Sequence, residues 1–293
     1  MIHLRAEDIA RFHTDGYFLV EDAVSPASLA ALRRDLDAWV QESRTHIGNW
    51  GATADGRSRF DCELGHNADD PRLRRVNNPA EISAAYEQVL LDSPVVDAVA
   101  ALIGPDVKVH HSKINLKRPG TATRVGYHQD FSFTPHTNDH LVTALVALDN
   151  VDMENGPLRV VPGSHLTGQV SLWQGGAFTG QVDADAAKVY EANSIPLAQK
   201  PGSVCLMHTK LMHGSDPNRS KAPRGLYICV YAAADAFALS PSPLPNRFDG
   251  QIVRGNASRQ ARLTEGRVEL PAAWKEAAFF AVQGQRPAVP LDG

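Results

Sequence analysis

Hydrophobic positions recur at helical spacing near the start of the chain and in shorter runs further along. Residues 4–15 predict a short helix that ends at Gly16, and residues 17–20 ("YFLV") read as an apolar strand. A longer amphipathic helix follows, with Ser25 as its cap and Pro26 at its first position, because leucines recur every three or four residues from Leu29. Residues 79–104 read as a further helix, so the chain begins with a helical layer.

From residue 105 to residue 235 the pattern changes to short runs rich in β-branched and aromatic residues, separated by Pro, Gly and Asn turns. Examples are "DVKVHHSKINLKRPG", "HLVTALVALDNV" and "RGLYICVYAAAD". Several short strands without long helices predict an antiparallel sandwich or barrel of jelly-roll type, not a parallel sheet. We therefore expect a mainly β protein with flanking helices, and a single domain spanning residues 1–293.

Within that domain we expect three parts: a helical layer and lid segment at 1–104, the jelly-roll core at 105–235, and a C-terminal extension at 236–293 with one short helix near "PAAWKEAAFFAV". Residues 45–80 are polar, with little periodicity, and predict a loop with short elements. Loops of this length are usually functional or mobile. This one contains several arginines: Arg57, Arg59, Arg72, Arg74 and Arg75. They are either solvated surface residues or part of a lid that contacts a polar or anionic substrate.

Composition narrows the class of protein. Of the 293 residues, 43% are hydrophobic and 21% charged, which is typical of a globular protein and argues against a mostly disordered chain. With 29 basic and 33 acidic side chains the net charge is −4, so no overall positive field favours nucleic acid or an anionic membrane. No apolar run reaches the roughly 20 residues that cross a bilayer, and the start lacks a signal-peptide pattern. We expect a cytoplasmic protein with a small-molecule partner, and with neither a nucleic-acid nor a membrane partner; the pattern carries no information on oligomeric state.

Candidate chemistry begins in "GYHQDFSF", where His128 and Asp130 are two residues apart. In a strand these two side chains would share one face while Gln129 points away. A 2-His-1-carboxylate triad on Fe(II) needs one more histidine, from a neighbouring strand. His-x-Asp alone is common, so the third ligand decides the interpretation.

His213 is the preferred third ligand. It begins a predicted hairpin with the turn "SDPNRSKAP", and the return strand starts at Arg224, 11 residues later (224 − 213). An arginine on an adjacent strand near the metal could bind a carboxylate through two hydrogen bonds. His208 is the rival, but it lies inside the strand before the turn. The predicted metal ligands are therefore His128, Asp130 and His213.

This ordered set, with "DNVDMENGPLRVVPGSH" inside it and "FHTDGYFLVEDAVSP" before it, resembles the phytanoyl-CoA dioxygenase family of Fe(II)/2-oxoglutarate-dependent oxygenases over nearly the whole chain. The resemblance implies a double-stranded β-helix (cupin-like) core. It also implies Fe(II) on the triad, 2-oxoglutarate bound to the metal with its distal carboxylate on Arg224, and O2 as oxidant. The implied reaction hydroxylates a small molecule and releases succinate and CO2. Related halogenases have a small residue at the position of Asp130, so its carboxylate indicates hydroxylation or a related oxidation.

The stretch "SKINLKRPG" is similar to the "S-R-x-N-x-K-P-G" segment of ectoine hydroxylases, one bacterial branch of that family. By this resemblance Asn115 is a predicted contact of 2-oxoglutarate, with Lys113 and Lys117 as weaker candidates. The long aromatic signature that follows the metal motif in that branch is replaced here by "FSFTPHTND". Ectoine is therefore not expected as the substrate.

Two other classes stay open at this point. A metal-dependent lyase or hydrolase of cupin type would use the same ligands but would not need Arg224. A non-catalytic jelly-roll binding protein would bind no iron. Formation of succinate from 2-oxoglutarate separates all three. The arginines of residues 57–75 favour a small anionic or zwitterionic substrate.

Other histidines receive more ordinary interpretations. Of His110 and His111, one is expected to face the cavity and the other the outside. His136 and His140 are expected in a solvated loop, and His165 in a Pro-Gly turn where it serves the local backbone.

Overall fold

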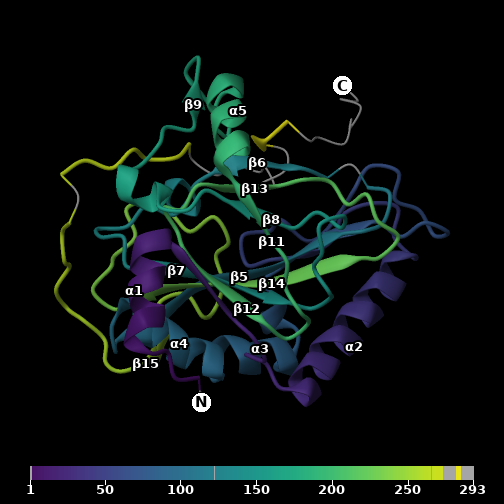
Figure 1. Ribbon diagram of the computed structural model, residues 1–293. Coiled ribbons are helices and arrows are strands. Elements are labelled where there is room, and N and C mark those ends of the chain that lie inside the picture. Colours follow the sequence, from purple (N-terminus) through teal and green to yellow (C-terminus); the bar gives the residue numbers. More distant parts are fainter. Residues whose placement is uncertain (1, 122, 265, 273–281, 285–293) are drawn as a thin grey trace.

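The computed structural model describes residues 2–121, 123–264, 266–272 and 282–284, and its strands form two facing antiparallel sheets (Figure 1). The larger has nine strands in the order β1-β12-β7-β14-β5-β4-β3-β2, with β15 also paired to β5. Its strands are β1 (Tyr17–Val20), β2 (Trp50–Ala52), β3 (Ser58–Cys62), β4 (Leu73–Asn77), β5 (Val107–Lys117), β7 (Leu141–Ala147), β12 (Val204–His208), β14 (Arg224–Ala233) and β15 (Ile252–Arg254).

The smaller sheet has the order β11-β8-β13-β6. Its strands are β6 (Val125–His128), β8 (Leu158–Val160), β11 (Ile195–Leu197) and β13 (His213–Ser215). A separate two-stranded hairpin joins β9 (Trp173–Gln174) to β10 (Ala177–Phe178). Apolar side chains from both main sheets meet between them, among them Leu145, Leu158 and Ile228. The protein is therefore mainly β, as predicted.

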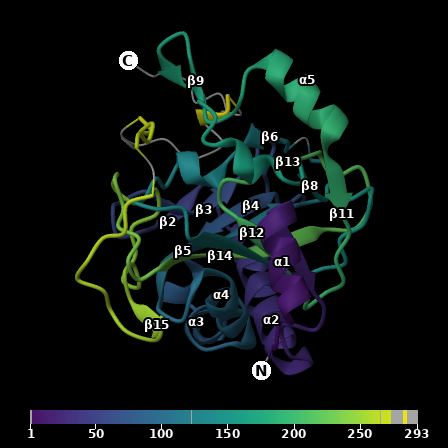
Figure 2. The same cartoon turned by 60° about the vertical axis from the view of Figure 1, so that its left-hand side comes forward.

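Four helices lie on the outer side of the larger sheet, opposite the smaller one (Figure 2). They are α1 (Ala6–Asp15), α2 (Pro26–Ser43), α3 (Ala84–Leu91) and α4 (Pro94–Ile103); α5 (Ala184–Asn193) lies apart, beyond the smaller sheet. Two predicted boundaries are confirmed: α1 stops at Gly16, which has φ +83°, and the Ser25 hydroxyl accepts a hydrogen bond from the Ser28 N–H at the start of α2.

The single helix predicted for residues 79–104 is wrong. This stretch contains a short 3-10 turn (Pro79–Glu81), α3 and α4. Proline disfavours helical geometry in the residue before it and lacks an N–H, so α3 ends before Ser93 and Pro94 starts a new helix. The break lets both helices lie across the sheet.

Three buried tyrosine hydroxyls make hydrogen bonds in this region. Two connect the larger sheet to the helical layer, and one connects two helices of that layer. Tyr227 and Tyr231 of β14 donate to the carbonyls of Tyr86 and Leu90, each at 2.9 Å, and Tyr86 donates to the Leu32 carbonyl, also at 2.9 Å. These hydrogen bonds pair the buried hydroxyl groups, and that of Tyr231 also satisfies the Leu90 carbonyl, which has no helical donor because residue 94 is proline.

We expect Tyr231→Phe to lower the free energy of unfolding by about 1–3 kcal/mol, because the buried Leu90 carbonyl loses this partner and Pro94 has no N–H to replace it. Urea denaturation measures the loss. Tyr17→Phe is the control, because Tyr17 is only partly buried. Equal stability of the two variants would contradict the prediction.

Residues 45–80 contain short elements separated by loops, as predicted, but β2, β3 and β4 also extend the larger sheet, which the sequence does not predict. Phe60 and Val76 face the helical core, whereas Asp61, Arg75 and Asn77 line a cavity on the inner face. With polar residues on the inner face, the strands lack the apolar periodicity that marks a buried element. The sheet consequently extends beyond residues 105–235.

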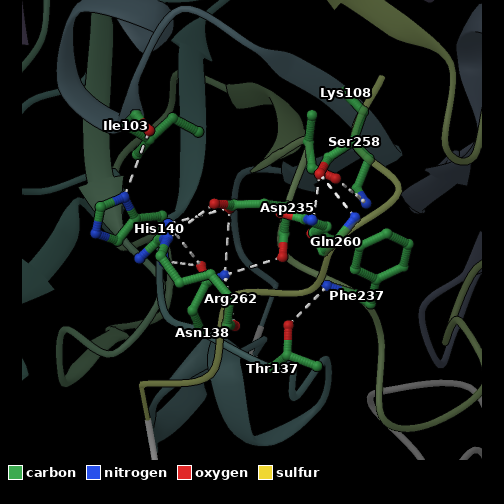
Figure 3. Close-up of polar contacts among 11 residues, drawn as sticks. Ile103, Lys108, Thr137, Asn138, His140, Asp235, Phe237, Ser258, Gln260 and Arg262 are labelled. Atoms are coloured by element: carbon green, nitrogen blue, oxygen red, sulfur yellow. Dashed lines mark hydrogen bonds and ion pairs between the residues drawn. The ribbon is translucent and has the colours of Figure 1, made fainter. Parts of the chain in front are cut away.

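The segment after β15 runs along one side of the molecule (Figure 1) and is held by a cluster of polar contacts (Figure 3). The Arg262 guanidinium binds the Asp235 carboxylate at 2.8 Å, and Asn138 donates to the Asp235 and Arg262 carbonyls, each at 3.2 Å. The short helix predicted near residues 271–282 falls largely on residues 273–281, outside the described part of the chain. Among the described helices, none has both the length and the apolar character needed to cross a membrane.

Candidate active site

The structure brings the three predicted metal ligands together between the sheets. β13 begins at His213, which pairs with His128 at the end of β6. The Nε2 atoms of His128 and His213 lie 3.5 and 3.7 Å from Oδ1 of Asp130. All three possible ligand atoms lie within 4.8 Å of one another. Two imidazoles and one carboxylate thus converge on one point.

Asp130 is not on the strand, contrary to the prediction, because β6 ends at His128 and a 3-10 turn (Asp130–Ser132) begins at Asp130. Gln129 fixes this change of direction. Its buried amide donates to the Lys210 carbonyl at 2.7 Å, and its oxygen accepts from the Val170 N–H at 2.7 Å. The residue between the two ligands therefore holds the turn that presents Asp130.

Hydrogen bonds behind the triad set the orientation of each ligand. Nδ1 of His128 donates to the Gly126 carbonyl at 2.8 Å, and Nδ1 of His213 donates to the Leu211 carbonyl at 2.9 Å. A carbonyl can only accept, so both Nδ1 atoms carry the proton and Nε2 is directed at the centre. The second oxygen of Asp130 accepts from the Thr143 hydroxyl at 2.8 Å. Such partners fix the geometry of metal-binding residues.

Burial and charge suit the triad to metal binding. Burial, together with the neighbouring His128, lowers the pKa of His213 to about 4, so this imidazole is neutral near pH 7. Burial alone would raise the pKa of Asp130, but His213, His128 and Lys113 hold it well below its usual range. A neutral imidazole and an ionised carboxylate are the forms that bind a metal. Two nitrogen donors and one oxygen donor fit the facial triad of non-haem Fe(II) oxygenases.

A small cavity next to the triad ends at two buried basic side chains. Arg224 and Lys117 line it together with the triad. Nε and Nη2 of Arg224 donate to the Gly156 carbonyl at 3.1 and 2.7 Å, and Nζ of Lys117 donates to the Ser215 hydroxyl at 2.8 Å. Burial and the neighbouring Arg224 hold the pKa of Lys117 well below its usual value. Burial lowers the pKa of Arg224 to about 10, which leaves the guanidinium charged at neutral pH. This end of the cavity is suited to a carboxylate.

The predicted hairpin between His213 and Arg224 is not formed, because β13 belongs to the smaller sheet and β14 to the larger one. The two residues approach the same cavity because the sheets face each other. Gly156 lies at this crossing with φ +77°, and a Cβ there would stand 2.5 Å from the Asp216 carbonyl oxygen. Only glycine fits against the Asp216 carbonyl and the Lys117 side chain, which explains the glycine of "NGP" in the sequence.

A larger cavity of about 360 Å³ opens on the other side of Asp130. Arg75, Lys113 and Asp130 line both cavities. Nε of Arg75 donates to Oδ1 of Asn115 at 3.0 Å, so Asn115 lies beside the small cavity that it also lines. Burial lowers the pKa of Arg75 to about 10 and that of Lys113 to about 8. The junction of the cavities is therefore positively charged.

The floor of the larger cavity is a polar patch on three adjacent strands. Asp61 pairs with Arg75, Arg75 with Asn115, and Asn77 with Lys113 across β3, β4 and β5. Their side chains share the inner face because strand residues alternate. Burying polar groups is unfavourable without partners. A row of this kind is expected where a polar ligand binds.

The remaining arginines of residues 57–75 are held by other protein groups. Arg57 lines the larger cavity but binds Asp55, with Nε 2.7 Å from Oδ2. Arg59 is buried and pairs with Glu81 at 2.8 Å, and Arg72 pairs with Asp70 at 2.7 Å. Of the two interpretations, solvated surface or substrate contact, Arg75 best fits the second.

The expectation that His110 or His111 faces the outside is wrong, since both are buried. The pairing of β14 with β5 shifts at Val230/Tyr231 and leaves His110 unpaired. This bulge turns the two rings toward each other, with centroids 4.8 Å apart, and His111 reaches the larger cavity. His136 is also buried, 5.1 Å from His110, so the solvated loop predicted there is wrong for this residue.

His208 and His165 lie away from the triad. Their ring centroids are 5.1 Å apart, and Nε2 of His165 contacts the His13 carbonyl at 3.1 Å. His208 is on β12, and its Nδ1 accepts from the Lys210 N–H at 3.0 Å. His165 thus contacts a backbone carbonyl of α1, not the local turn that the sequence predicts, and His208 is not part of the triad.

Sequence reasoning missed several side chains that shape the site. Thr143 and Gln129 position Asp130, and Ser215 contacts Lys117. A lone hydroxyl in the apolar run "LVTALVA" was a usable signal for Thr143. Asp61 and Asn77 had no such signal, because only the pairing of β3 to β5 places them on the cavity floor.

Comparisons with known proteins agree with this geometry. The sequence matches the phytanoyl-CoA dioxygenase (PhyH) family over residues 12–226. It is 29% identical to a probable alpha-ketoglutarate-dependent hypophosphite dioxygenase of Stutzerimonas stutzeri, covering 91% of this chain and 92% of the relative. It is 26% identical to an ectoine dioxygenase of Streptomyces coelicolor, covering 83% and 82%.

Among solved structures, EctD from S. alaskensis with 2-oxoglutarate and 5-hydroxyectoine superimposes with a TM-score of 0.66, at 23% identity, covering 90% of this chain and 88% of that one. This likeness confirms the predicted jelly-roll fold. The family match excludes the two other classes, a lyase or hydrolase and a non-catalytic binding protein. The chain belongs to the phytanoyl-CoA dioxygenase family and is an Fe(II)- and 2-oxoglutarate-dependent dioxygenase.

Proposed function

We propose that the protein hydroxylates a small anionic or zwitterionic metabolite, with release of succinate and CO2 from 2-oxoglutarate. The observation that carries the proposal is the arrangement of two cavities on either side of Asp130, joined at Arg75 and Lys113. One cavity suits the co-substrate and the other the substrate. The family name itself carries no information on the substrate of this chain.

In this proposal His128, Asp130 and His213 hold Fe(II). When bound, the iron supplies the chemistry that couples decarboxylation of 2-oxoglutarate to transfer of an oxygen atom from O2. Arg224 binds the distal carboxylate of 2-oxoglutarate, and its contacts with the Gly156 carbonyl fix the plane of the guanidinium. A planar guanidinium held in this way matches the geometry of a carboxylate.

Asn115 and Lys113 are proposed as further contacts of 2-oxoglutarate, since both line the small cavity. Asn115 is oriented by Arg75 through the 3.0 Å hydrogen bond. Lys113 stands at the junction, where its ammonium also faces the larger cavity. The positive charge of Lys113 therefore attracts both 2-oxoglutarate in the small cavity and an anionic substrate in the larger one.

The larger cavity supports a small, charged substrate. Its volume of about 360 Å³ is near the lower end of the range for small-molecule sites, roughly 300–1,000 Å³. Arg75 remains charged although it is buried, and an anionic group would offset that charge. Hypophosphite and ectoine, the compounds named for two relatives, are small and charged as well.

Succinate formation tests this proposal. The protein, loaded with Fe(II) and supplied with 2-oxoglutarate and O2, is assayed with three sets of small metabolites of similar size: neutral, anionic and zwitterionic. We expect charged compounds to raise succinate formation at least about 10-fold over the rate without substrate, with one hydroxylated product per succinate. Stimulation by neutral compounds only would contradict the substrate class.

A further inference from the structure

Asp61 is a buried carboxylate on the floor of the larger cavity that the proposed chemistry does not use. It lies on β3, is only 2% exposed, and lines the cavity. Its Oδ2 atom is buried and has no hydrogen-bond partner among the residues that the structure describes. A buried carboxylate oxygen without a donor is costly unless a ligand supplies one.

The surroundings of Asp61 favour a role in binding. Asp61 is the cross-strand partner of Arg75, so the cavity floor presents a carboxylate and a guanidinium side by side. Burial raises the pKa of Asp61 above its usual value, although Arg75, Arg74 and Arg57 partly oppose that effect. The neighbouring Asp55, by contrast, is already bonded to the Thr53 hydroxyl and to Arg57, each at 2.7 Å.

We infer that Asp61 is a specificity-determining residue, which binds a cationic N–H group of a zwitterionic substrate whose anionic group lies at Arg75 and Lys113. This inference rests on the proposed function and selects the zwitterion from its two substrate classes. Adjacent strands are about 4.8 Å apart, so Asp61 on β3 lies one strand from Arg75 and two strands from Lys113. The two charged groups of the substrate are therefore separated by roughly 5–10 Å.

A matched series of ligands tests the inference directly: 4-aminobutyrate, 4-hydroxybutyrate and butyrate, and 3-aminopropylphosphonate with propylphosphonate. Binding is measured by calorimetry on protein that contains 2-oxoglutarate and Zn(II), which cannot turn over. We expect the amino compound of each set to bind at least about 10-fold more tightly than the compound without a donor, a difference of about 1.4 kcal/mol. The hydroxyl compound is expected to lie between them.

Asp61→Asn keeps the size of the side chain and removes its charge. We expect it to reduce the preference for the amino compounds to less than about 3-fold, and to bind butyrate and propylphosphonate at least as tightly as the wild type, because a negative charge beside their anionic group is removed. Asp55→Asn is the matched control, because that carboxylate lines the same cavity but is bonded to Thr53 and Arg57. It is expected to retain the full preference.

The outcomes separate the inference from the proposed function. If the wild-type protein binds the plain anions as tightly as the amino compounds, the inference is overturned while an anionic substrate stands. If Asp61→Asn retains the preference, Asp61 serves only as a counter-charge to the arginines and the inference is overturned. If no charged compound binds or stimulates succinate formation, the proposed function fails as well. Should Asp61→Asn not fold, equal binding of the plain anions and the amino compounds by the wild-type protein would still overturn the inference.

Discussion

His213→Ala is expected to abolish 2-oxoglutarate-dependent succinate formation and iron binding. Loss of an outer partner of a metal ligand costs about 10–100-fold, and loss of a ligand itself should exceed that range. The Nε2 atom of His213 faces Oδ1 of Asp130 at 3.7 Å, so its removal leaves only two of the three converging donors. Iron content by elemental analysis and succinate by chromatography measure the two losses.

His208→Ala is the matched control for this experiment. His208 is a partly buried histidine in the same part of the chain, but it lies outside the triad, against His165. The control protein is expected to retain iron and activity. If His213→Ala kept both and His208→Ala lost them, the ligand assignment would be wrong.

Arg224→Met is expected to raise the KM for 2-oxoglutarate at least about 30-fold, which corresponds to roughly 2 kcal/mol, the lower end of the cost of removing one partner of a buried, hydrogen-bonded charge pair. The methionine retains apolar volume but cannot bind the distal carboxylate. Since Arg224 lies at the end of the small cavity, kcat at saturating 2-oxoglutarate should change by only a few-fold. Steady-state assays with varied 2-oxoglutarate separate the two constants.

Arg159→Met controls for the loss of a neighbouring arginine. Arg159 is on β8 and binds Ser194, with Nε 3.0 Å from the hydroxyl, and it does not line the small cavity. Its replacement is expected to leave the KM for 2-oxoglutarate unchanged. Equal effects of the two substitutions would remove Arg224 from the proposed co-substrate site.

The sequence predicts those parts of this protein whose signals are local. The caps of α1 and α2 at Gly16 and Ser25 follow from single residues and short periodic runs. The grouping of His128, Asp130 and His213 rests on residue type and order, which the chemistry of a facial triad restricts strongly. In both cases the deciding information lies in the residues themselves.

The features that the sequence predicts wrongly depend on pairing between strands that are distant along the chain. Strands β2 to β4 lack apolar alternation because Asp61, Arg75 and Asn77 face a cavity, so their sequence looks like a loop. The hairpin expected before Arg224 is absent because β13 pairs with β6 and β8 instead. Which of two strands a short segment joins is decided by packing between sheets, and no local pattern records it.

Amino-acid substitutions on the inner and outer faces of β3, β4 and β5 are expected to have different effects during evolution. Outward residues such as Val76 and Ile114 belong to the helical core, whereas their immediate neighbours on the chain line the cavity. A substitution at an inward position alters what the cavity accepts without creating a void in the core. Such strands allow the range of accepted compounds to drift by single substitutions while the fold keeps its stability.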